Sequence, residues 1–169
     1  MLSRIINKLK YNFLLTKIKP EIIGYKNDNG QLIEDSGVSN MTHVSNKKNV
    51  KIGLGVFIGH FNYIDGYNKV TIGDGCQITN YASILTHSSH HTLRLHGNLD
   101  IPNELSEIGL VTGEVIIGAY SYIGAHTVIM PGSKIGKGCI VSAYSYVNGE
   151  FPDYSILRGQ PARIVGSTK

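Results

Sequence analysis

The sequence predicts an all-β protein, a three-sided parallel β-helix that occupies most of a single domain. Three observations predict it: a β-branched residue recurs every six positions, a small residue stands four places after most of these, and 20 of the 169 residues are glycine. A period of six fits neither the 3.6 residues of a helical turn nor the alternation of a long strand, because it requires a turn after every short strand.

The β-branched residues fall into four groups of three. They are Ile52, Ile58 and Ile64; Ile72, Ile78 and Ile84; Ile117, Ile123 and Ile129; and Ile135, Val141 and Val147. In a three-sided coil these side chains point inward and stack on their equivalents in neighbouring coils, so eighteen residues make one circuit. Four coils spaced about 4.8 Å apart form a stack of roughly 19 Å. Val38 and Val44 are expected to begin a degenerate earlier coil.

Glycines and small residues mark the expected corners. Glycine directly follows six of the repeat starts, where we expect a corner to need backbone freedom: Gly53, Gly59, Gly73, Gly118, Gly124 and Gly136. The small inward residues include Cys76, Ala82, Ser121, Thr127, Ser133, Cys139 and Ser145. The two cysteines occupy the same position with a whole coil between them, roughly 10 Å apart. This distance is too long for a disulfide, so we expect buried free thiols in a reducing compartment.

The repeat divides the chain into three parts. We expect an N-terminal segment over residues 1–37 that is partly helical, the β-helix over 38–150 with an excursion loop at about 86–114, and a C-terminal tail over 151–169. The first nineteen residues mix apolar and basic side chains with the spacing of an amphipathic helix, which is expected to pack on its own protein or to contact a membrane surface peripherally. They contain no apolar run of membrane-spanning length and no evident cleavage site, so a cytoplasmic location is expected, with the inner face of the membrane as a further option.

The formal net charge of +4 permits an anionic partner, but the lysines and arginines are dispersed. Charge alone therefore does not predict a nucleic-acid partner, and none is expected.

The six-residue rhythm stops between Ile84 and Ile117, and histidines gather where it stops. His87, His90, His91 and His96 lie within ten residues. Long excursions from a rigid fold often build a binding site, although the histidines of an exposed loop also occur without any function. His87 is the strongest candidate for a general base because it lies nearest the rigid coil. His90 and His91 are candidate supporting residues, as is His126, which stands at an outward position of a regular repeat.

A family resemblance is carried by three segments of the chain. The excursion contains ILTHSSHHTLRLHG, which is similar to the excursion of sugar and galactoside O-acetyltransferases in the hexapeptide-repeat superfamily. Their final coils resemble VIIGAYSYIGAHTVIMPGSKIGKGCIVSAYSYV, and their closing segment resembles GQPAR at residues 159–163. The resemblance implies that the β-helix is left-handed, an exception to the usual right-handed crossover.

The same resemblance implies an activity and a set of site residues. His87 would act directly on an acceptor hydroxyl with acetyl-CoA as the acyl donor, without an acyl-enzyme and with no metal, while a backbone N–H stabilises the oxyanion. Members of the family form homotrimers with active sites between adjacent prisms. Matching positions imply pantetheine contacts at Ala125 and Ala143, phosphate contacts at Arg163, and acceptor contacts at Asn62 and Asp65. Asn148 and Gly149 depart from the threonine and lysine that relatives often place near the cofactor.

The expected acceptor is a carbohydrate hydroxyl, in the synthesis of a cell-surface polysaccharide or its precursor. Acetylation of an antibiotic or of a sugar amine is the nearest alternative. Two other classes stay open: a zinc enzyme like the γ-type carbonic anhydrases, with three histidine ligands, and a noncatalytic scaffold that uses the solenoid faces for protein contacts. Fold alone does not decide among them.

Overall fold

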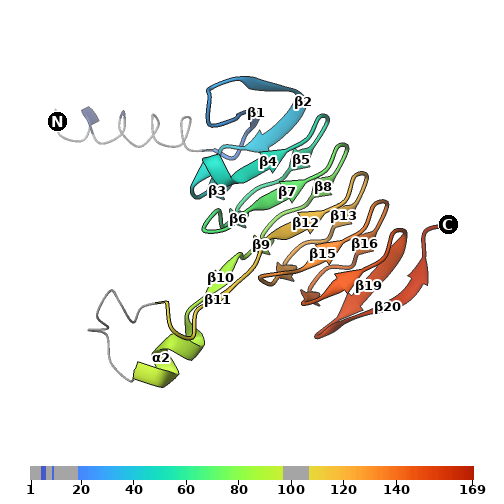
Figure 1. The fold of residues 1–169 in the computed structure, drawn as a ribbon. Coiled ribbons are helices and arrows are strands. Elements are labelled where there is room, and N and C mark those ends of the chain that lie inside the picture. The colour runs from blue at the N-terminus through green and yellow to red at the C-terminus, as the bar shows by residue number, and fades with distance from the viewer. Residues whose placement is uncertain (1–4, 7–8, 10–18, 97–106) are drawn as a thin grey trace.

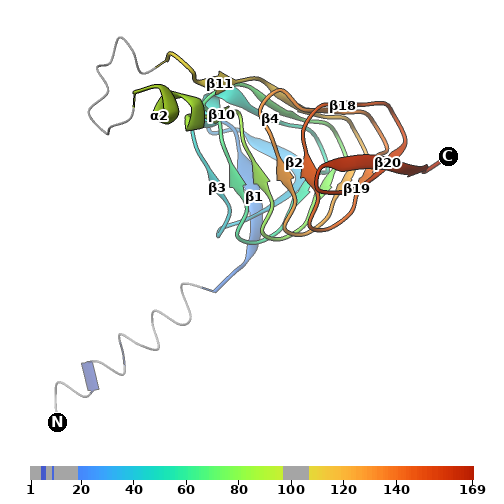
Figure 2. The same ribbon diagram turned by 90° about the horizontal axis from the view of Figure 1, so that it is seen from below.

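The computed structural model describes residues 5, 6, 9, 19–96 and 107–169. It confirms the predicted parallel β-helix: short strands wind around a three-sided prism, with one sheet on each side (Figures 1 and 2). The helix expected near the N-terminus falls almost entirely outside the described residues. No helix among the described residues has the length and apolar character needed to cross a membrane.

The three sides of the prism are called faces A, B and C. Face A contains, in spatial order, β1 (Ile22–Lys26), β2 (Leu32–Ser39), β5 (Phe57–Ile58), β8 (Gln77–Ile78), β13 (Tyr122–Ile123), β16 (Ile140–Val141), β19 (Ser155–Gly159) and β20 (Ala162–Ser167). Face B contains β3 (His43–Val44), β6 (Tyr63–Ile64), β9 (Ser83–Ile84), β14 (Val128–Ile129) and β17 (Tyr146–Val147). Face C contains β4 (Val50–Ile52), β7 (Val70–Ile72), β12 (Val115–Ile117), β15 (Lys134–Ile135) and β18 (Glu150–Phe151).

The β-branched repeat residues form the core, as predicted. All twelve are buried, and the most exposed of them, Ile52, retains only 8% of its surface. They stack in register within each face, for example from Ile58 through Ile78 and Ile123 on face A. Val38 pairs with Ile58, and Val44 pairs with Ile64, which confirms the earlier coil. Burying a column of such side chains contributes about 1.5–3 kcal/mol per residue, and it is this apolar interior that holds the coils together.

The small inward residues are also buried, and both cysteines are free thiols, as expected. Ser121 lies between them in the stack. Its carbonyl accepts a hydrogen bond from the N–H of Gln77, the residue after Cys76, and its hydroxyl accepts one from the N–H of Cys139. Burial raises the pKa of both thiols, so they are inert members of the core.

The prediction that the corner glycines supply backbone freedom was wrong. None of the six that follow a repeat start has a positive φ. Instead, a Cβ on these glycines would meet the next coil: at Gly124 it would lie 2.4 Å from the N of Ala143, and at Gly118 2.5 Å from the backbone of Gly136. The left-handed backbone occurs two residues later in each turn. Close approach between coils, not backbone freedom, therefore requires glycine directly after the strand.

Aromatic side chains fill several of these left-handed positions at the corner between faces A and B. Phe61, Tyr81, His126 and Tyr144, here called the aromatic ladder, all have φ near 60°. Their rings stack from coil to coil, with centroids 5.2, 4.9 and 4.7 Å apart in that order. A non-glycine residue in this conformation costs about 1–2 kcal/mol of stability, and ring stacking offsets part of this cost. The exposed ring edges form an apolar ridge along the corner.

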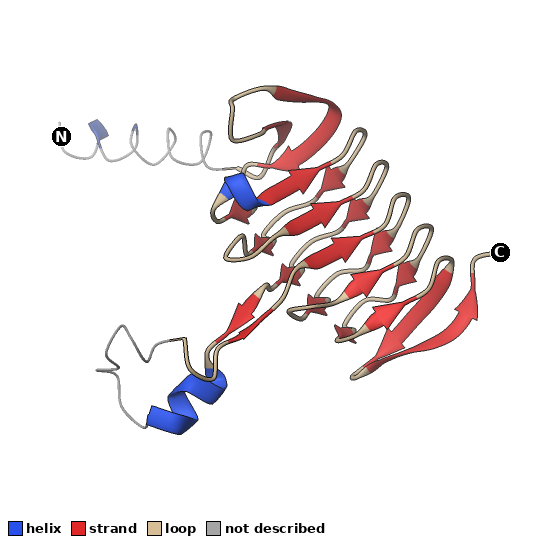
Figure 3. Cartoon of the chain, viewed as in Figure 1, coloured by secondary structure: helices blue, strands red, loops and turns tan. Residues whose placement is uncertain are grey.

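Both ends of face A close with an antiparallel hairpin. β1 pairs with β2 before the first coil, and β20 pairs with β19 after the last one. The parallel winding itself extends to residue 159, because β18 and β19 continue faces C and A. Residues 22–39 and 155–167 therefore contain strands that the repeat pattern did not reveal (Figure 3).

The excursion leaves the prism after β9 and returns before β12. It starts with β10 (His87–Ser88), continues into α2 (His90–His96), and comes back through β11 (Val111–Thr112). β10 and β11 pair antiparallel, with His87 opposite Thr112. His87 therefore stands at the base of the excursion, where two strands fix the backbone.

Candidate active site

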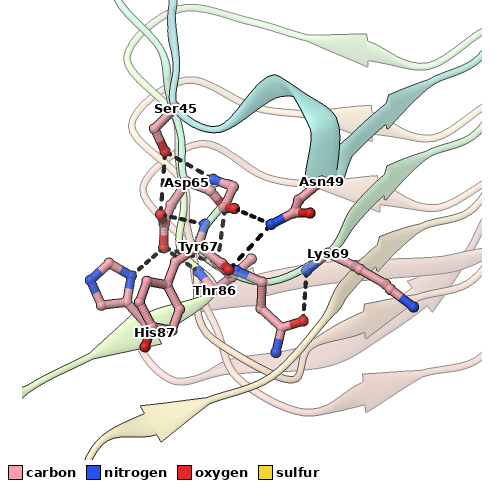
Figure 4. A network of polar contacts seen from close by, with 9 residues as sticks. Ser45, Asn49, Asp65, Tyr67, Lys69, Thr86 and His87 are labelled. Carbon is pink, nitrogen blue, oxygen red and sulfur yellow. Dashed lines mark hydrogen bonds and ion pairs between the residues drawn. The ribbon is translucent and has the colours of Figure 1, made fainter. Parts of the chain in front are cut away.

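The main feature of the candidate site is a close pair between Asp65 and His87 at the corner between faces B and C. Asp65 Oδ2 lies 2.6 Å from His87 Nδ1 (Figure 4). Asp65 is buried, whereas the side chain of His87 is 37% exposed. The pair thus joins a fixed interior carboxylate to an imidazole that reaches the surface.

The repeat itself brings these two residues together. Asp65 directly follows β6, and His87 comes three residues after β9, which lies in register one coil further along face B. Thr86 links them, because its N–H donates to Asp65 Oδ2 at 3.0 Å and its hydroxyl donates to the same oxygen at 2.9 Å. The Tyr67 N–H donates to the other oxygen, Oδ1, at 3.0 Å. Both carboxylate oxygens are therefore held by the corner.

These contacts set the charge state of Asp65. Burial alone would raise the pKa of this carboxyl, but hydrogen bonds from the Thr86 N–H, from His87 and from the Tyr67 N–H outweigh it, and the pKa lies below its ordinary value. The carboxylate is thus ionised at neutral pH. An ionised carboxylate only accepts hydrogen bonds, so Nδ1 of His87 carries the proton that joins the two groups.

The remaining ring nitrogen of His87, Nε2, faces away from Asp65 (Figure 4). With Nδ1 protonated, Nε2 carries the lone pair. The ring of Tyr67 packs against the imidazole, with centroids 4.5 Å apart. Together Asp65 and Tyr67 hold the imidazole with its basic nitrogen directed outward, which is the arrangement that a general base requires.

The other predicted histidines lie apart from this pair. His90 and His91 begin α2, where their rings lie 4.1 Å apart, and His90 Nδ1 is 2.7 Å from the Ser88 hydroxyl. His126 is a member of the aromatic ladder, at the opposite edge of face B from His87. Within residues 19–96 and 107–169, no three His, Cys, Asp or Glu side chains converge in a way that could hold a metal ion.

Asn62 lies on the inner side of the corner between faces A and B. Its side chain is 3% exposed; Nδ2 donates to the Gly59 carbonyl at 2.9 Å, and Oδ1 accepts from the Ala82 N–H at 2.7 Å. These contacts tie two neighbouring coils together. The structure therefore gives Asn62 a place in the corner and does not bring it to His87.

The residues expected to contact the cofactor gather at the corner between faces A and B. Ala125 and Ala143 occupy equivalent places in successive coils, and among the described residues neither N–H has a hydrogen-bond acceptor. Arg163 lies on β20 directly opposite Arg158 on β19, so both side chains point to the same side of the hairpin. Gln160, in the turn between them, donates to the Tyr144 carbonyl at 2.8 Å, which attaches this hairpin to the same corner.

His87 and this corner do not meet within one chain. Ala125 is in register with Asn80, and His87 comes seven residues after Asn80. At about 3.3 Å per residue the two corners are roughly 20 Å apart along face B.

Three residues that build the site were not predicted from the sequence. Tyr67 and Thr86 stand at corner positions outside the repeat, and Arg158 lies on β19, after the last predicted repeat residue. Thr86 is fully buried, and its hydroxyl also accepts a hydrogen bond from the N–H of Asn68. Only the register of neighbouring coils, which aligns residue 65 with residue 85 and so brings Asp65 next to Thr86, identifies the partners of Asp65.

Comparison with known proteins agrees with the fold. Residues 114–149 match the family described as bacterial transferase hexapeptide (six repeats). The galactoside O-acetyltransferase of Escherichia coli is 31% identical over 136 residues, which cover 78% of this chain and 61% of that protein. A putative lipopolysaccharide biosynthesis O-acetyl transferase from the same organism is 29% identical over 65% of this chain and 56% of its own length. The chain thus spans little more than half of these two relatives.

Solved structures of acetyltransferases also share this fold. A hexapeptide-repeat acetyltransferase from Vibrio cholerae has a TM-score of 0.68 at 29% identity, with 82% of this chain and 74% of that chain covered. A galactoside acetyltransferase in complex with coenzyme A also has a TM-score of 0.68, at 25% identity, over 81% of this chain and 64% of that chain. With its buried six-residue repeat and these matches, the chain has the hexapeptide-repeat parallel β-helix of these acetyltransferases.

Proposed function

We propose that this protein is an acetyl-CoA-dependent O-acetyltransferase that acts on a carbohydrate hydroxyl, with His87 as the general base. The Asp65–His87 pair carries the proposal, because it fixes the His87 imidazole at the base of the excursion with Nε2 directed outward. Relatives named as galactoside and lipopolysaccharide O-acetyltransferases support a carbohydrate acceptor and a role in cell-surface polysaccharide synthesis.

The geometry leads to a direct transfer. His87 Nε2 removes the proton from the acceptor hydroxyl as its oxygen attacks the thioester carbonyl of acetyl-CoA. The new C–O bond forms, the C–S bond breaks, and the thiolate leaves with the proton that the imidazolium returns. Asp65 stays ionised throughout and stabilises the imidazolium, so we assign it as a positioning residue instead of an acceptor contact.

The corner between faces A and B fits the cofactor. The N–H groups of Ala125 and Ala143, which have no acceptor among the described residues, are about 4.8 Å apart, one coil spacing, and they can donate to the amide oxygens of the pantetheine. Arg158 and Arg163 add two positive charges on the β19–β20 hairpin that ends face A, where they can pair with phosphates. Solved relatives in complex with coenzyme A and with acetyl-CoA support a cofactor of this kind.

A homotrimer would bring the two corners together, since His87 of one protomer would face the cofactor corner of the next. The outward side chains support this. Those of face A include exposed Phe57, Tyr122 and Ile140, and the neighbouring corner carries the aromatic ladder. Face C instead presents Lys51, Thr71, Ile116, Lys134 and Glu150 in one row. Subunit contacts favour apolar and aromatic surface, so face C is the side left to solvent.

The test measures thiol release from acetyl-CoA by the purified protein with a panel of free sugars, sugar nucleotides, sugar amines and aminated antibiotics. We expect release with a hydroxyl acceptor, and its loss by about 10²–10⁴-fold in His87→Ala with acetyl-CoA binding retained. Equal activity of the variant would remove His87 from the mechanism. Release only with amine acceptors would replace O-acetylation by N-acetylation, and a protein that does not bind acetyl-CoA would overturn the proposal.

A further inference from the structure

Three lysines line a small pocket on the first coils, on the far side of the loop that carries Asp65 and Tyr67. The pocket has a volume of about 120 Å³ and is lined by Lys48, Asn49, Lys51, Lys69, Val70 and Thr71. Lys48 and Asn49 come from the 3₁₀ helix η1 (Lys47–Asn49), and Lys51 lies on β4 beside Thr71 of β7. This volume is about four times the ~30 Å³ that one water takes up in the liquid. The lysine pocket, as we call it, is thus large enough for a small polar group.

The charge of the lysine pocket is not balanced by the protein. Within the described part of the chain, no carboxylate forms an ion pair with Lys48, Lys51 or Lys69. Glu114 precedes Val115, which pairs with Val70, so this carboxylate lies near Lys69 in the register, yet no ion pair joins the two.

Further along the prism the nearby lysines are paired. Lys134 on face C lies 2.8 Å from Glu150, and Lys137, in the turn that follows β15, lies 3.8 Å from Asp153. The later lysines are therefore neutralised, whereas the three around the pocket have no ion pair among the described residues, which favours an anionic ligand.

The lysine pocket and the candidate active site share one loop. Asn49, which lines it, donates from Nδ2 to the Gly66 carbonyl at 2.9 Å, within the loop that continues to Tyr67. The N–H of Asn68 donates to the Thr86 hydroxyl, and Lys69 follows. In Figure 4, Lys69 extends from this loop on the side away from His87. Tyr67, packed on His87, and Lys69 are two residues apart, roughly 7 Å along the chain.

We propose that the lysine pocket binds the phosphate or diphosphate of the acceptor, so that the acetylated carbohydrate is a phosphorylated sugar and not a free one. This proposal rests on the proposed acetyl transfer. A phosphate on the anomeric oxygen lies about one sugar ring from the hydroxyls, so an acceptor that spans the loop places a hydroxyl at His87 and its phosphate among the lysines. Lysine ammonium groups bind phosphate as point charges. A nucleotide-activated sugar and a lipid-linked sugar both carry this chemistry.

The test separates the pocket from the transfer reaction. Binding of inorganic pyrophosphate is measured by calorimetry for the wild type, for Lys51→Gln/Lys69→Gln, and for Lys134→Gln as a control that removes a lysine of the same face. We expect the double variant to bind about tenfold more weakly or worse, the control to match the wild type, and high ionic strength to weaken binding. Equal pyrophosphate binding by the double variant, or none by the wild type, would overturn the lysine pocket as a phosphate site.

Steady-state kinetics then identify the ligand. For the double variant we expect the KM for a phosphorylated acceptor to rise about tenfold, with the KM for acetyl-CoA unchanged. UDP-glucose and a prenyl-diphosphate-linked sugar in detergent micelles form the two acceptor arms, and the arm that shows the rise names the source. A rise in the KM for acetyl-CoA instead would assign the lysines to the cofactor and overturn the proposal. Lysine-dependent pyrophosphate binding without acetyl transfer to any acceptor would overturn the proposed function and leave the anion site in place.

Discussion

Replacement of Asp65 by asparagine tests the role of the carboxylate most sharply, because the side chain keeps its shape and loses its charge. Three groups point at Oδ2: the Thr86 N–H, the Thr86 hydroxyl and His87 Nδ1. Only the Tyr67 N–H and, at 3.4 Å, the Ser45 hydroxyl point at Oδ1. The amide oxygen of the variant is therefore expected to take the place of Oδ2, with the NH₂ group facing Tyr67 and Ser45.

This orientation predicts two separate effects. The Tyr67 N–H would face an NH₂ group instead of an acceptor, which costs about 1–3 kcal/mol of stability. His87 would keep its proton on Nδ1, but the imidazolium formed in the reaction would lose its carboxylate. Unit charges about 4 Å apart attract with about 4 kcal/mol at an effective dielectric constant of about 20, and the partial exposure of His87 reduces this. We expect the turnover rate to fall by about 10²–10³-fold.

The assay is thiol release at saturating acetyl-CoA and acceptor, together with the midpoint of thermal unfolding and the ¹⁵N shifts of the His87 ring. Ser45→Ala is the matched control, because it removes a contact to Asp65 Oδ1 and leaves the pair with His87 intact; its rate should stay within about threefold of the wild type. A variant Asp65→Asn that turns over within threefold of the wild type would refute the role of the carboxylate. A proton found on Nε2 instead of Nδ1 would refute the orientation argued above.

Four further predictions follow from the fold. Ile123→Ala leaves a cavity in a fully buried column and should destabilise the protein by about 2–5 kcal/mol in denaturant unfolding. Gly118→Ala should cost about 3 kcal/mol or more, because its Cβ would lie 2.5 Å from the backbone of the next coil, whereas Gly132→Ala meets no neighbour and should cost only about 1–2 kcal/mol for its positive φ; equal losses would contradict the close-approach argument. The lowered pKa of Asp65 means that its carboxylate stabilises the fold above the unfolded value of about 3.9 and that this contribution is lost as the pH falls through the lower folded value; the stability gap between wild type and Asp65→Asn, followed by circular dichroism, should therefore close in acid. Tyr144→Ser should shift the proposed trimer toward monomer in sedimentation velocity, and an unchanged trimer would place the subunit contacts elsewhere.

The six-residue periodicity of the sequence predicts most of the fold. Each β-branched repeat residue is buried because the six-residue period alone assigns it an inward direction, and no long-range information is needed. The hairpins at the two ends were not predictable in this way, since Ile22–Lys26 and Ala162–Ser167 are outside the repeat. These strands pair with β2 and β19, whose place in the sheet is set only once the coils have formed.

The site was predictable only in part, for a related physical reason. The expectation that His87 lies near the rigid coil followed from its distance to Ile84, and the structure places it at the base of the excursion. The partnership with Asp65 depends on which corner each residue occupies. Two extra residues in the second coil, between Ile64 and Ile72, form the corner that presents Asp65 and Tyr67 to His87. A strict six-residue count treats these residues as an irregularity, although they build the site.

The antiparallel hairpins at the two ends also limit how the molecule can grow. A stack of parallel coils has open strands at its first and last turn, and identical copies could in principle add end to end into a fibre. On face A both terminal strands run against the direction of the coils, so two copies placed end to end would have two reversed strands between one parallel ladder and the next. The hairpins thus interrupt the parallel ladder of face A at both ends, and end-to-end association of copies would not continue the six-residue winding on that face.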